Sequence, residues 1–235
     1  MRKENETNEV VAYYDEIADT YDESRFGNSY GRFIDTEERM ILDRLFPPGR
    51  GETRLEIACG TGRLTGYATH GLDASGEMLA HAKRRFETVD FRQASADDTG
   101  FADESFDAVY GFHLMMHLDP DLIEGILREV HRILKPGGRF VFDLPSRERR
   151  RRLRHRQASW HGGTEMSTGD VRSLAGDRFV LRRSFGVMML PVHKLPHGLR
   201  RPLTKLDFAL ANGPMKEYSS YLVFELVKKA PAPAG

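Results

Sequence analysis

The sequence has little cysteine and no long apolar run. Cys59 is the single cysteine among 235 residues, so an internal disulfide framework is excluded and a reducing compartment is expected. No apolar stretch approaches the ~20 residues that a bilayer-spanning helix needs. The first residues, MRKENETNE, lack the apolar segment of a signal peptide. We therefore expect a cytoplasmic protein without stable membrane insertion.

The sequence also has no net charge, because 35 Lys and Arg residues balance 35 Asp and Glu residues. Their distribution is uneven: residues 1–146 carry 17 basic and 28 acidic residues, and residues 147–235 carry 18 and 7. This asymmetry is typical of a face that binds anions, or of two halves that attract each other. Seven arginines fall within 146–156 (SRERRRRLRHR). They predict either a phosphate- or carboxylate-binding segment or a solvated helix. No aromatic residues interleave with them, so no nucleic-acid partner is expected.

Short apolar runs alternate with helical stretches through the middle of the chain. The predicted strands are 54–58, 68–72, 89–93, 106–110 and 139–144, and the predicted helices are 10–26, 31–45, 76–86 and 121–134. Strands separated by helices imply parallel pairing with right-handed crossovers. Two late strands, 179–190 and 219–228, flank a helix near 198–211. The predicted fold class is therefore α/β, a Rossmann-like, doubly wound and mostly parallel sheet with an antiparallel edge strand at the C-terminal end.

A glycine-rich turn follows the first predicted strand. The segment 55–64 (LEIACGTGRL) combines a strand, the turn and a helix start, and Gly60 and Gly62 allow a ligand to approach the backbone. Asp73 follows the second strand, where doubly wound sheets place an acid on a ribose diol. The alternatives are a plain tight turn at the glycines and a helix N-cap at Asp73. Together the features favour a nucleoside-binding site.

Four segments in order resemble the successive motifs of class I S-adenosylmethionine-dependent methyltransferases: LEIACGTGRL, GLDASGEMLAHAKRR, FADESFDAVYGFHLMMHL and REVHRILKPGGRFVFDLP. The opening YYDEIADTYDESRF resembles the N-terminal helix of quinone-biosynthesis and related small-molecule methyltransferases. The resemblance covers roughly residues 10–146. It implies S-adenosylmethionine as cofactor, S-adenosylhomocysteine as product and a small-molecule acceptor.

The resemblance also implies one methyltransferase domain over residues 1–235. Its expected parts are an N-terminal helical lid (1–50), a cofactor-binding core (51–146), an acceptor-shaping region with the last strands (147–230) and a tail (230–235). In the acceptor-shaping region, Trp160, Met188 and Met189 suit a pocket wall and suit a core equally well. No oligomeric state is predicted.

Individual residues take roles from the resemblance. Glu56 stands where an acid holds the methionine ammonium, Asp73 where an acid holds the ribose, and His113 beside the sulfonium. The other expected cofactor-binding residues are Tyr13, Tyr21 and Arg25 in the N-terminal helix, Ala58, Gly60 and Gly62 in the turn, Ala74 and Met78 around the adenine, Ser95, Ala96 and Asp97 at its edge, and Gly111 and Phe112 near the sulfonium.

Three features depart from the family pattern. Ala58 replaces the usual first glycine of the turn, and Ser95 stands where an aspartate commonly binds the adenine amine, so Ser95 or Asp97 is expected to take that role. The interval from Gly62 to Asp73 is short, which predicts a first helix of barely two turns. The turn does not have the GxGxxG pattern of dinucleotide dehydrogenases, which argues against membership of that family.

The methyl group of the cofactor is already activated, so the chemistry requires alignment and exclusion of water more than a nucleophile. His113 is the candidate catalytic residue, as a general base, as a hydrogen-bond partner of the acceptor or as a structural group. His113 and His117 lie four apart without an evident third ligand, so no metal is expected. The predicted function is methyl transfer to a small acceptor, including an anionic or phosphorylated one; the alternative is a cofactor-binding protein with a non-methylating or regulatory role.

Overall fold

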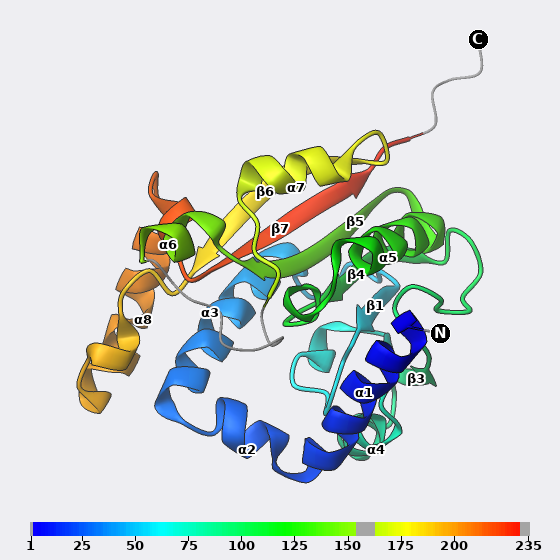
Figure 1. The fold of residues 1–235 in the computed structure, drawn as a ribbon, viewed down its shortest axis with the longest axis horizontal. Helices are drawn as coiled ribbons and strands as arrows, with labels where there is room; N and C mark the ends of the chain where they lie inside the picture. The colour runs from blue at the N-terminus through cyan, green and yellow to red at the C-terminus, as the bar shows by residue number, and fades with distance from the viewer. Residues whose placement is uncertain (1, 154–162, 231–235) are drawn as a thin grey trace.

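Seven strands form one mixed sheet in the computed structural model, which describes residues 2–153 and 163–230 (Figure 1). The strand order is β3-β2-β1-β4-β5-β7-β6. The strands are β1 (Arg54–Ile57), β2 (His70–Asp73), β3 (Asp90–Gln93), β4 (Phe106–Gly111), β5 (Leu134–Pro145), β6 (Phe179–Val187) and β7 (Tyr221–Lys228). Strands β1 to β5 pair in parallel, and β7 runs antiparallel to both β5 and β6. The chain reverses its direction of sheet growth between β1 and β4, which creates the crevice typical of doubly wound folds.

Helices cover both faces of this sheet. The helices are α1 (Arg2–Ile17), α2 (Tyr21–Phe26), α3 (Ser29–Leu45), α4 (Gly76–Arg85), α5 (Pro120–Ile133), α6 (Arg147–Arg152), α7 (Thr168–Ala175) and α8 (His197–Ala211). Short 3₁₀ turns are η1 (Ala18–Thr20), η2 (Thr65–Tyr67), η3 (Met115–His117), η4 (Val192–Lys194) and η5 (Lys216–Tyr218). None of the helices within the described ranges is both long enough and apolar enough to cross a membrane.

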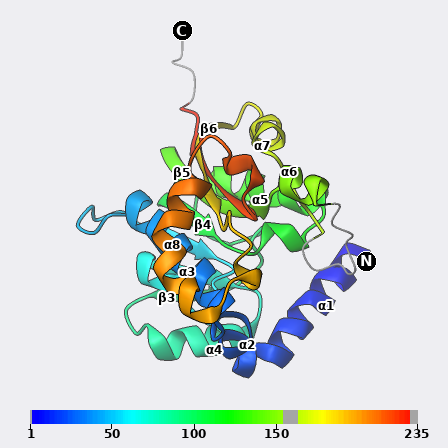
Figure 2. The ribbon, with the colours of Figure 1, turned by 90° about the vertical axis from the view of Figure 1, so that its left-hand side faces the viewer.

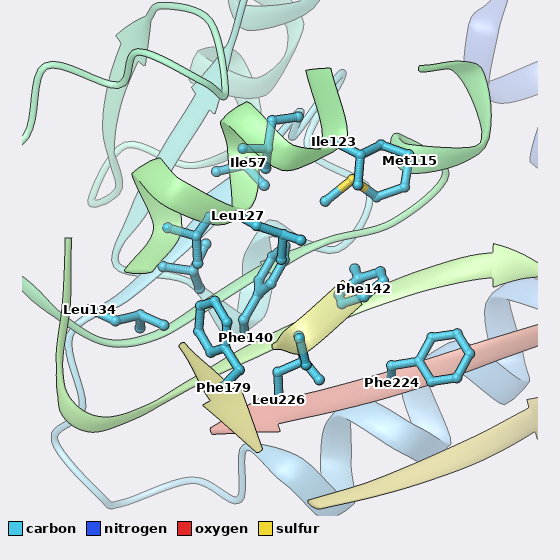
Figure 3. Close-up of a cluster of buried hydrophobic side chains, with 14 of the residues drawn as sticks. Ile57, Met115, Ile123, Leu127, Leu134, Phe140, Phe142, Phe179, Phe224 and Leu226 are labelled. Atoms are coloured by element: carbon cyan, nitrogen blue, oxygen red, sulfur yellow. The ribbon is translucent and has the colours of Figure 1, made fainter. Parts of the chain in front are cut away.

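The alternation of side chains along β5 separates two cores. Phe140 and Phe142 pack with α5, α7 and Phe224 on one face (Figure 3). Val141 points to the opposite face, where it joins buried side chains of α3 and α8 such as Phe208. Successive side chains of a strand point to opposite faces, so a strand that is apolar throughout requires cover on both sides. This arrangement confirms the predicted fold class.

Several local predictions need correction. The helix predicted at 10–26 is divided by η1 into α1 and α2, and α1 already begins at Arg2. The two-turn helix expected after Gly62 is the single turn η2, because β2 begins at His70 and leaves no room for more. The predicted antiparallel edge strand is confirmed as β6, which pairs antiparallel with β7 at the end of the sheet.

Candidate functional site

A cavity of about 1030 Å³ opens where β1, β2 and β4 end. Ala58 follows β1, Asp73 ends β2 and Phe112 follows β4, and all three line it. Val10 and Tyr14 of α1 line the same cavity from the opposite side. Ligands of doubly wound folds bind at this carboxyl edge, where the strand order reverses. The fold therefore places the cavity at the expected ligand site.

The glycine-rich turn is held by Asp73. The Gly60 N–H donates to Asp73 Oδ2 at 2.7 Å, and the Ser75 N–H donates to Asp73 Oδ1 at 2.9 Å. Burial raises the pKa of the Asp73 carboxyl. Gly60 has φ +54°, and a Cβ placed on it would meet nothing closer than Met78 Sδ at 4.0 Å. The turn thus leaves open space beside its backbone, which a ligand can occupy.

Ala58 takes a left-handed backbone conformation, with φ +50°. A non-glycine residue in this region costs roughly 1–2 kcal/mol. Substitution of the family's glycine by Ala58 is therefore more than a change in packing, because the turn keeps a geometry that glycine adopts without strain. Strain of this kind is concentrated at ligand-binding sites.

Three acidic residues of the N-terminal segment hold that segment over the cavity through contacts with α4 and the glycine-rich turn. Asp15 Oδ1 accepts from Ser75 Oγ at 2.5 Å, and Asp19 Oδ1 lies 3.1 Å from His81 Nε2. Asp22 pairs with Arg85 at 2.5 Å and accepts from Thr61 Oγ1 at 2.6 Å. Their spacing of four and three residues puts these acids on one side of the N-terminal segment, facing α4. This spacing is visible in the sequence, but the contacts of the three acids with α4 could be identified only from the structure.

Most of the predicted cofactor-binding residues come together in this cavity. The predicted residues that line it are Tyr21, Ala58, Gly60, Asp73, Ala74, Met78, Ser95, Ala96, Asp97, Phe112 and His113. Tyr13, Arg25, Glu56, Gly62 and Gly111 are not among the lining residues. Additional lining residues, which the prediction of individual sites omitted, include Tyr14, Ser75, Asp98, Leu114 and His117.

The predicted residues outside the lining have other contacts. The Arg25 guanidinium donates to the Tyr13 hydroxyl at 3.3 Å. Gly62 packs against α4, and a Cβ on Gly111 would lie 2.6 Å from Ile57 Cγ1, so Gly111 permits the close approach of β4 to β1. At both glycines the close packing of neighbouring residues explains why no side chain is present.

Glu56 lies beneath the turn and is 4% exposed. The Thr65 hydroxyl donates to Glu56 Oε2, and burial raises the pKa of Glu56 to about 8. The Thr65 hydrogen bond and the positive charge of Arg63 only partly offset this effect of burial. A carboxyl in this state gains a strong partner if a cation approaches it.

Residues 55–142 match the family model of the methyltransferase domain. The segment 55–142 is a class I S-adenosylmethionine-dependent methyltransferase domain. Over 136 residues the chain is 35% identical to demethylmenaquinone methyltransferase of Chlorobaculum parvum, covering 53% of this chain and 55% of that protein. It is 33% identical over 142 residues to a ubiquinone/menaquinone biosynthesis C-methyltransferase of Desulfotalea psychrophila, covering 56% of each. The chain thus spans about half the length of these curated relatives.

The fold is also that of solved methyltransferases. An S-adenosylmethionine-dependent methyltransferase of Thermotoga maritima superposes with a TM-score of 0.69 at 21% identity, covering 92% of this chain and 98% of that one. The open space at Gly60, the Asp73 carboxylate and the apolar walls formed by Ala74 and Met78 fit the family's cofactor in this cavity.

His113 of the methyltransferase domain lies in a buried charge cluster. Its Nε2 is 2.7 Å from Glu38 Oε1, and its Nδ1 is 3.5 Å from Asp143 Oδ2. The His113 backbone N–H also donates to Asp143 Oδ1 at 2.6 Å, and the residue has φ +58°. Arg63 Nη1 lies 2.7 Å from Glu38 Oε2. Glu38 and Asp143 were not predicted, because α3 and β5 bring them to His113 from distant parts of the chain.

The cluster favours the charged form of His113. Burial disfavours the imidazolium, but Glu38 and Asp143 outweigh it and raise the pKa of His113. Burial would likewise raise the pKa of Glu38, but Arg63 and His113 outweigh it and lower that pKa to about 2. The pKa of Asp143 is raised by burial, which His113 offsets only in part. Both ring nitrogens of His113 thus face carboxylates.

Glu38, His113 and Asp143 also form a group with metal-ligating atom types, whose ligand atoms lie within 4.8 Å of one another. Glu38 and His113 are already in direct contact, and the Arg63 guanidinium occupies the other Glu38 oxygen. A cation would compete with two positive groups here. We interpret the cluster as an ion-pair network.

The arginines of α6 bond mainly to the protein itself. Arg147 pairs with Asp170 at 2.7 Å and Arg150 with Glu165 at 3.4 Å. Arg149 Nη1 donates to the carbonyls of Met189 and Tyr218. The guanidinium of Arg152 lies over the Tyr218 ring, 5.4 Å from its centroid. Arg154, Arg156 and Trp160 lie outside the described residues.

Proposed function

We propose that the chain transfers a methyl group from S-adenosylmethionine to a small apolar acceptor with a quinone-like ring. The supporting observation is the cavity at the carboxyl edge of the sheet, where Asp73 and Gly60 meet. We also propose that residues 1–235 act as one cytoplasmic domain, in which the first 50 residues serve as the lid.

Each part of the cavity has a role in this proposal. When bound, the cofactor supplies an electrophilic methyl group. The Asp73 carboxylate would accept hydrogen bonds from the ribose diol, and Ser95 or Asp97, which bond to each other, would bind the adenine edge. Glu56, which is buried and does not line the cavity, would hold the ammonium group through a water molecule, because a nearby cation favours its charged form.

The lid excludes water from the reacting groups. Tyr14 and Tyr21 line the cavity, and their rings lie 6.0 Å apart in an edge-to-face arrangement. The bonds from Asp15 and Asp22 to the α4 side fix this aromatic cover in place. A closed site strengthens electrostatic interactions and holds the acceptor in line with the methyl group.

An apolar acceptor fits the cavity wall near His113. Phe112, Leu114 and Leu118 line this part, together with Tyr14. We assign His113 the role of a charged anchor for the loop after β4, because both of its ring nitrogens face carboxylates. In this role His113 takes no proton from the acceptor. The relatives named as demethylmenaquinone methyltransferases are consistent with a quinone-like ring.

An anionic or phosphorylated acceptor is the second candidate, and the arginines of α6 favour it. Changing Arg150 and Arg152 to Ala should then raise the acceptor KM strongly and leave cofactor affinity unchanged. An unchanged KM removes this candidate. The existing bonds of Arg147, Arg149 and Arg150 within the chain make the apolar acceptor the stronger proposal.

The test combines calorimetry and methyl transfer. The wild-type chain should bind S-adenosylhomocysteine and transfer labelled methyl groups from S-adenosylmethionine to demethylmenaquinone. Asp73→Asn should weaken binding about 10- to 100-fold, since hydrogen bonds to a charged group contribute about 1.5–3 kcal/mol. Asp90→Asn, at a side chain that is 74% exposed, is the matched control. Binding without transfer to any acceptor would support the regulatory alternative, and no binding by folded protein would reject both.

A further inference from the structure

One end of the molecule exposes apolar side chains beside basic ones. Of the six large exposed hydrophobic residues in the described ranges, five belong to α6, α8 or the turns that follow them; these five are Leu153, Leu199, Leu206, Leu210 and Met215. The sixth, Val180, is on β6. Helices α6 and α8 lie at the same end in Figure 1, and this end faces the viewer in Figure 2. We call residues 147–153 and 197–218 at this end the α6–α8 surface.

The apolar residues of α8 form one stripe. Leu199, Leu206 and Leu210 are separated by seven and four residues, so their side chains stack along the same side of the helix. Leu206 is 53% exposed and Leu210 is 45% exposed. The buried side of α8 is a different one, formed by Arg200, Thr204, Asp207, Phe208 and Ala211. The leucine stripe is thus a second apolar side of α8, separate from the side that packs on the core.

The surroundings of the stripe are basic. Arg201 and Lys205 are exposed and lie one turn apart on the other flank of the exposed side of α8, about 100° or more around the helix from the leucines. The α6–α8 surface contains nine Lys and Arg and three Asp and Glu. Asp207 is fully buried and accepts from the backbone N–H groups of Met189 and Leu190. The charge that this surface presents to its surroundings is therefore positive.

Helix α3 contacts both α8 and His113 at the cavity. Arg200 of α8 donates to Ser29 Oγ at 2.6 Å, at the start of α3. Further along α3, Glu38 contacts His113, which lines the cavity. Figure 2 shows α8 and α3 side by side, in agreement with their contacts. Helix α3 therefore connects the surface to the region where the acceptor is proposed to bind.

We propose that the α6–α8 surface docks on an anionic lipid bilayer, from which the chain takes its apolar acceptor. A surface that exposes an apolar helical stripe together with basic side chains, here Arg151, Arg201 and Lys205, is suited to dock on the plane of a bilayer. Anionic lipids attract Lys and Arg within a Debye length, and the leucines enter the region between headgroups and acyl chains. The source of the acceptor rests on the proposed function, whereas the docking itself is independent of it.

The test uses the full chain and vesicles of phosphatidylcholine, with and without phosphatidylglycerol. The wild type should sediment with vesicles that contain phosphatidylglycerol and dissociate as salt is raised. Leu206→Gln combined with Leu210→Gln should lower the partition coefficient about 10-fold or more. Arg201→Glu combined with Lys205→Glu should abolish the preference for the anionic lipid. Val180→Gln is the control for an exposed apolar residue elsewhere, and its binding should equal that of the wild type.

Three outcomes would overturn the docking proposal. These are absence of binding to the anionic vesicles, equal binding by the Leu206→Gln/Leu210→Gln variant, and a wild-type self-association that this variant loses without any vesicle binding. The last outcome would assign the stripe to a second copy of the chain. Calorimetry with S-adenosylhomocysteine should be unchanged in every variant. If the wild type binds vesicles but not the cofactor product, the proposed function is rejected and docking stands. If it binds the cofactor product but not vesicles, docking is rejected and the proposed function stands.

Discussion

Replacing Glu38 by Gln tests the charge cluster that holds His113. The Glu38 side chain is 2% exposed, and its two oxygens lie 2.7 Å from His113 Nε2 and 2.7 Å from Arg63 Nη1. Gln has nearly the same shape and keeps one acceptor oxygen, but it removes the negative charge. His113 would then face Arg63 with Asp143 as its remaining acid, at 3.5 Å. We expect the pKa of His113 to fall and the fold to lose stability.

The magnitude follows from the burial of the pair. Removing one partner of a buried ion pair typically costs about 3–5 kcal/mol. Part of this cost falls on the imidazolium, which loses its nearest carboxylate, so the pKa of His113 should fall.

The sign of the pH dependence is fixed by the raised pKa of His113. Its stabilising contribution is fully present below the unfolded value of about 6.5 and is lost as pH rises through the folded pKa. Glu38, with a pKa of about 2, stays ionised over this range. The loss of stability in Glu38→Gln should therefore be largest near pH 5 to 6, roughly at or below the unfolded pKa, and smaller in alkaline solution.

Two measurements check this reasoning. Urea denaturation of the wild type and of Glu38→Gln, repeated over a pH series, gives the difference in unfolding free energy, and NMR titration of the imidazole gives the pKa of His113. Glu124→Gln, in a partly exposed pair with Arg178, is the control and should change stability by less than about 1 kcal/mol. A pH-independent difference, or an unchanged His113 titration, would refute the electrostatic account of the cluster.

Three further substitutions probe other parts of the molecule. Burial and Asp207 raise the pKa of Glu37 to about 9, so the folded wild type loses stability as pH rises from about 4.5 towards 9, by up to ~1.4 kcal/mol per pH unit. Glu37→Gln should gain stability relative to the wild type over that interval, as measured by melting temperature. Asp22→Ala removes bonds to α4 and to the turn, and calorimetry should show about 5-fold weaker S-adenosylhomocysteine binding, with Glu23→Ala unchanged. Gly111→Ala crowds Ile57 and should cost about 1–3 kcal/mol in denaturation experiments.

The sheet and the cofactor side of the cavity were predictable because their pattern is local. Strand-helix alternation gave the parallel strands, and the spacing of Gly60 and Asp73 placed both at one edge of the sheet. The partners of His113 were not predictable in this way. Glu37 and Glu38 are adjacent on one helix. Glu38 contacts His113, whereas Glu37 accepts from the Met188 N–H, and the sequence alone does not show which glutamate has which partner. That distinction depends on how α3 packs, which is a tertiary property.

The uneven charge of the chain can now be followed to its contacts. If the acidic and basic halves mainly neutralised each other, the arginines of α6 would pair with acids from residues 1–146. Arg147 and Arg150 instead pair with Asp170 and Glu165, which belong to the same basic half.

The acids of the lid likewise have partners in their own half. Asp15, Asp19 and Asp22 contact Ser75, His81 and Arg85. The ion pairs that do cross between the halves include Arg178 with Glu124, Lys228 with Glu104 and Arg139 with Glu225, and none of these residues belongs to α6 or α8. The acids of the lid are thus used within their own half, while Arg151 of α6 and Arg201 and Lys205 of α8 are exposed. A surface with this charge and an apolar stripe is better explained by an anionic partner outside the chain than by attraction within it.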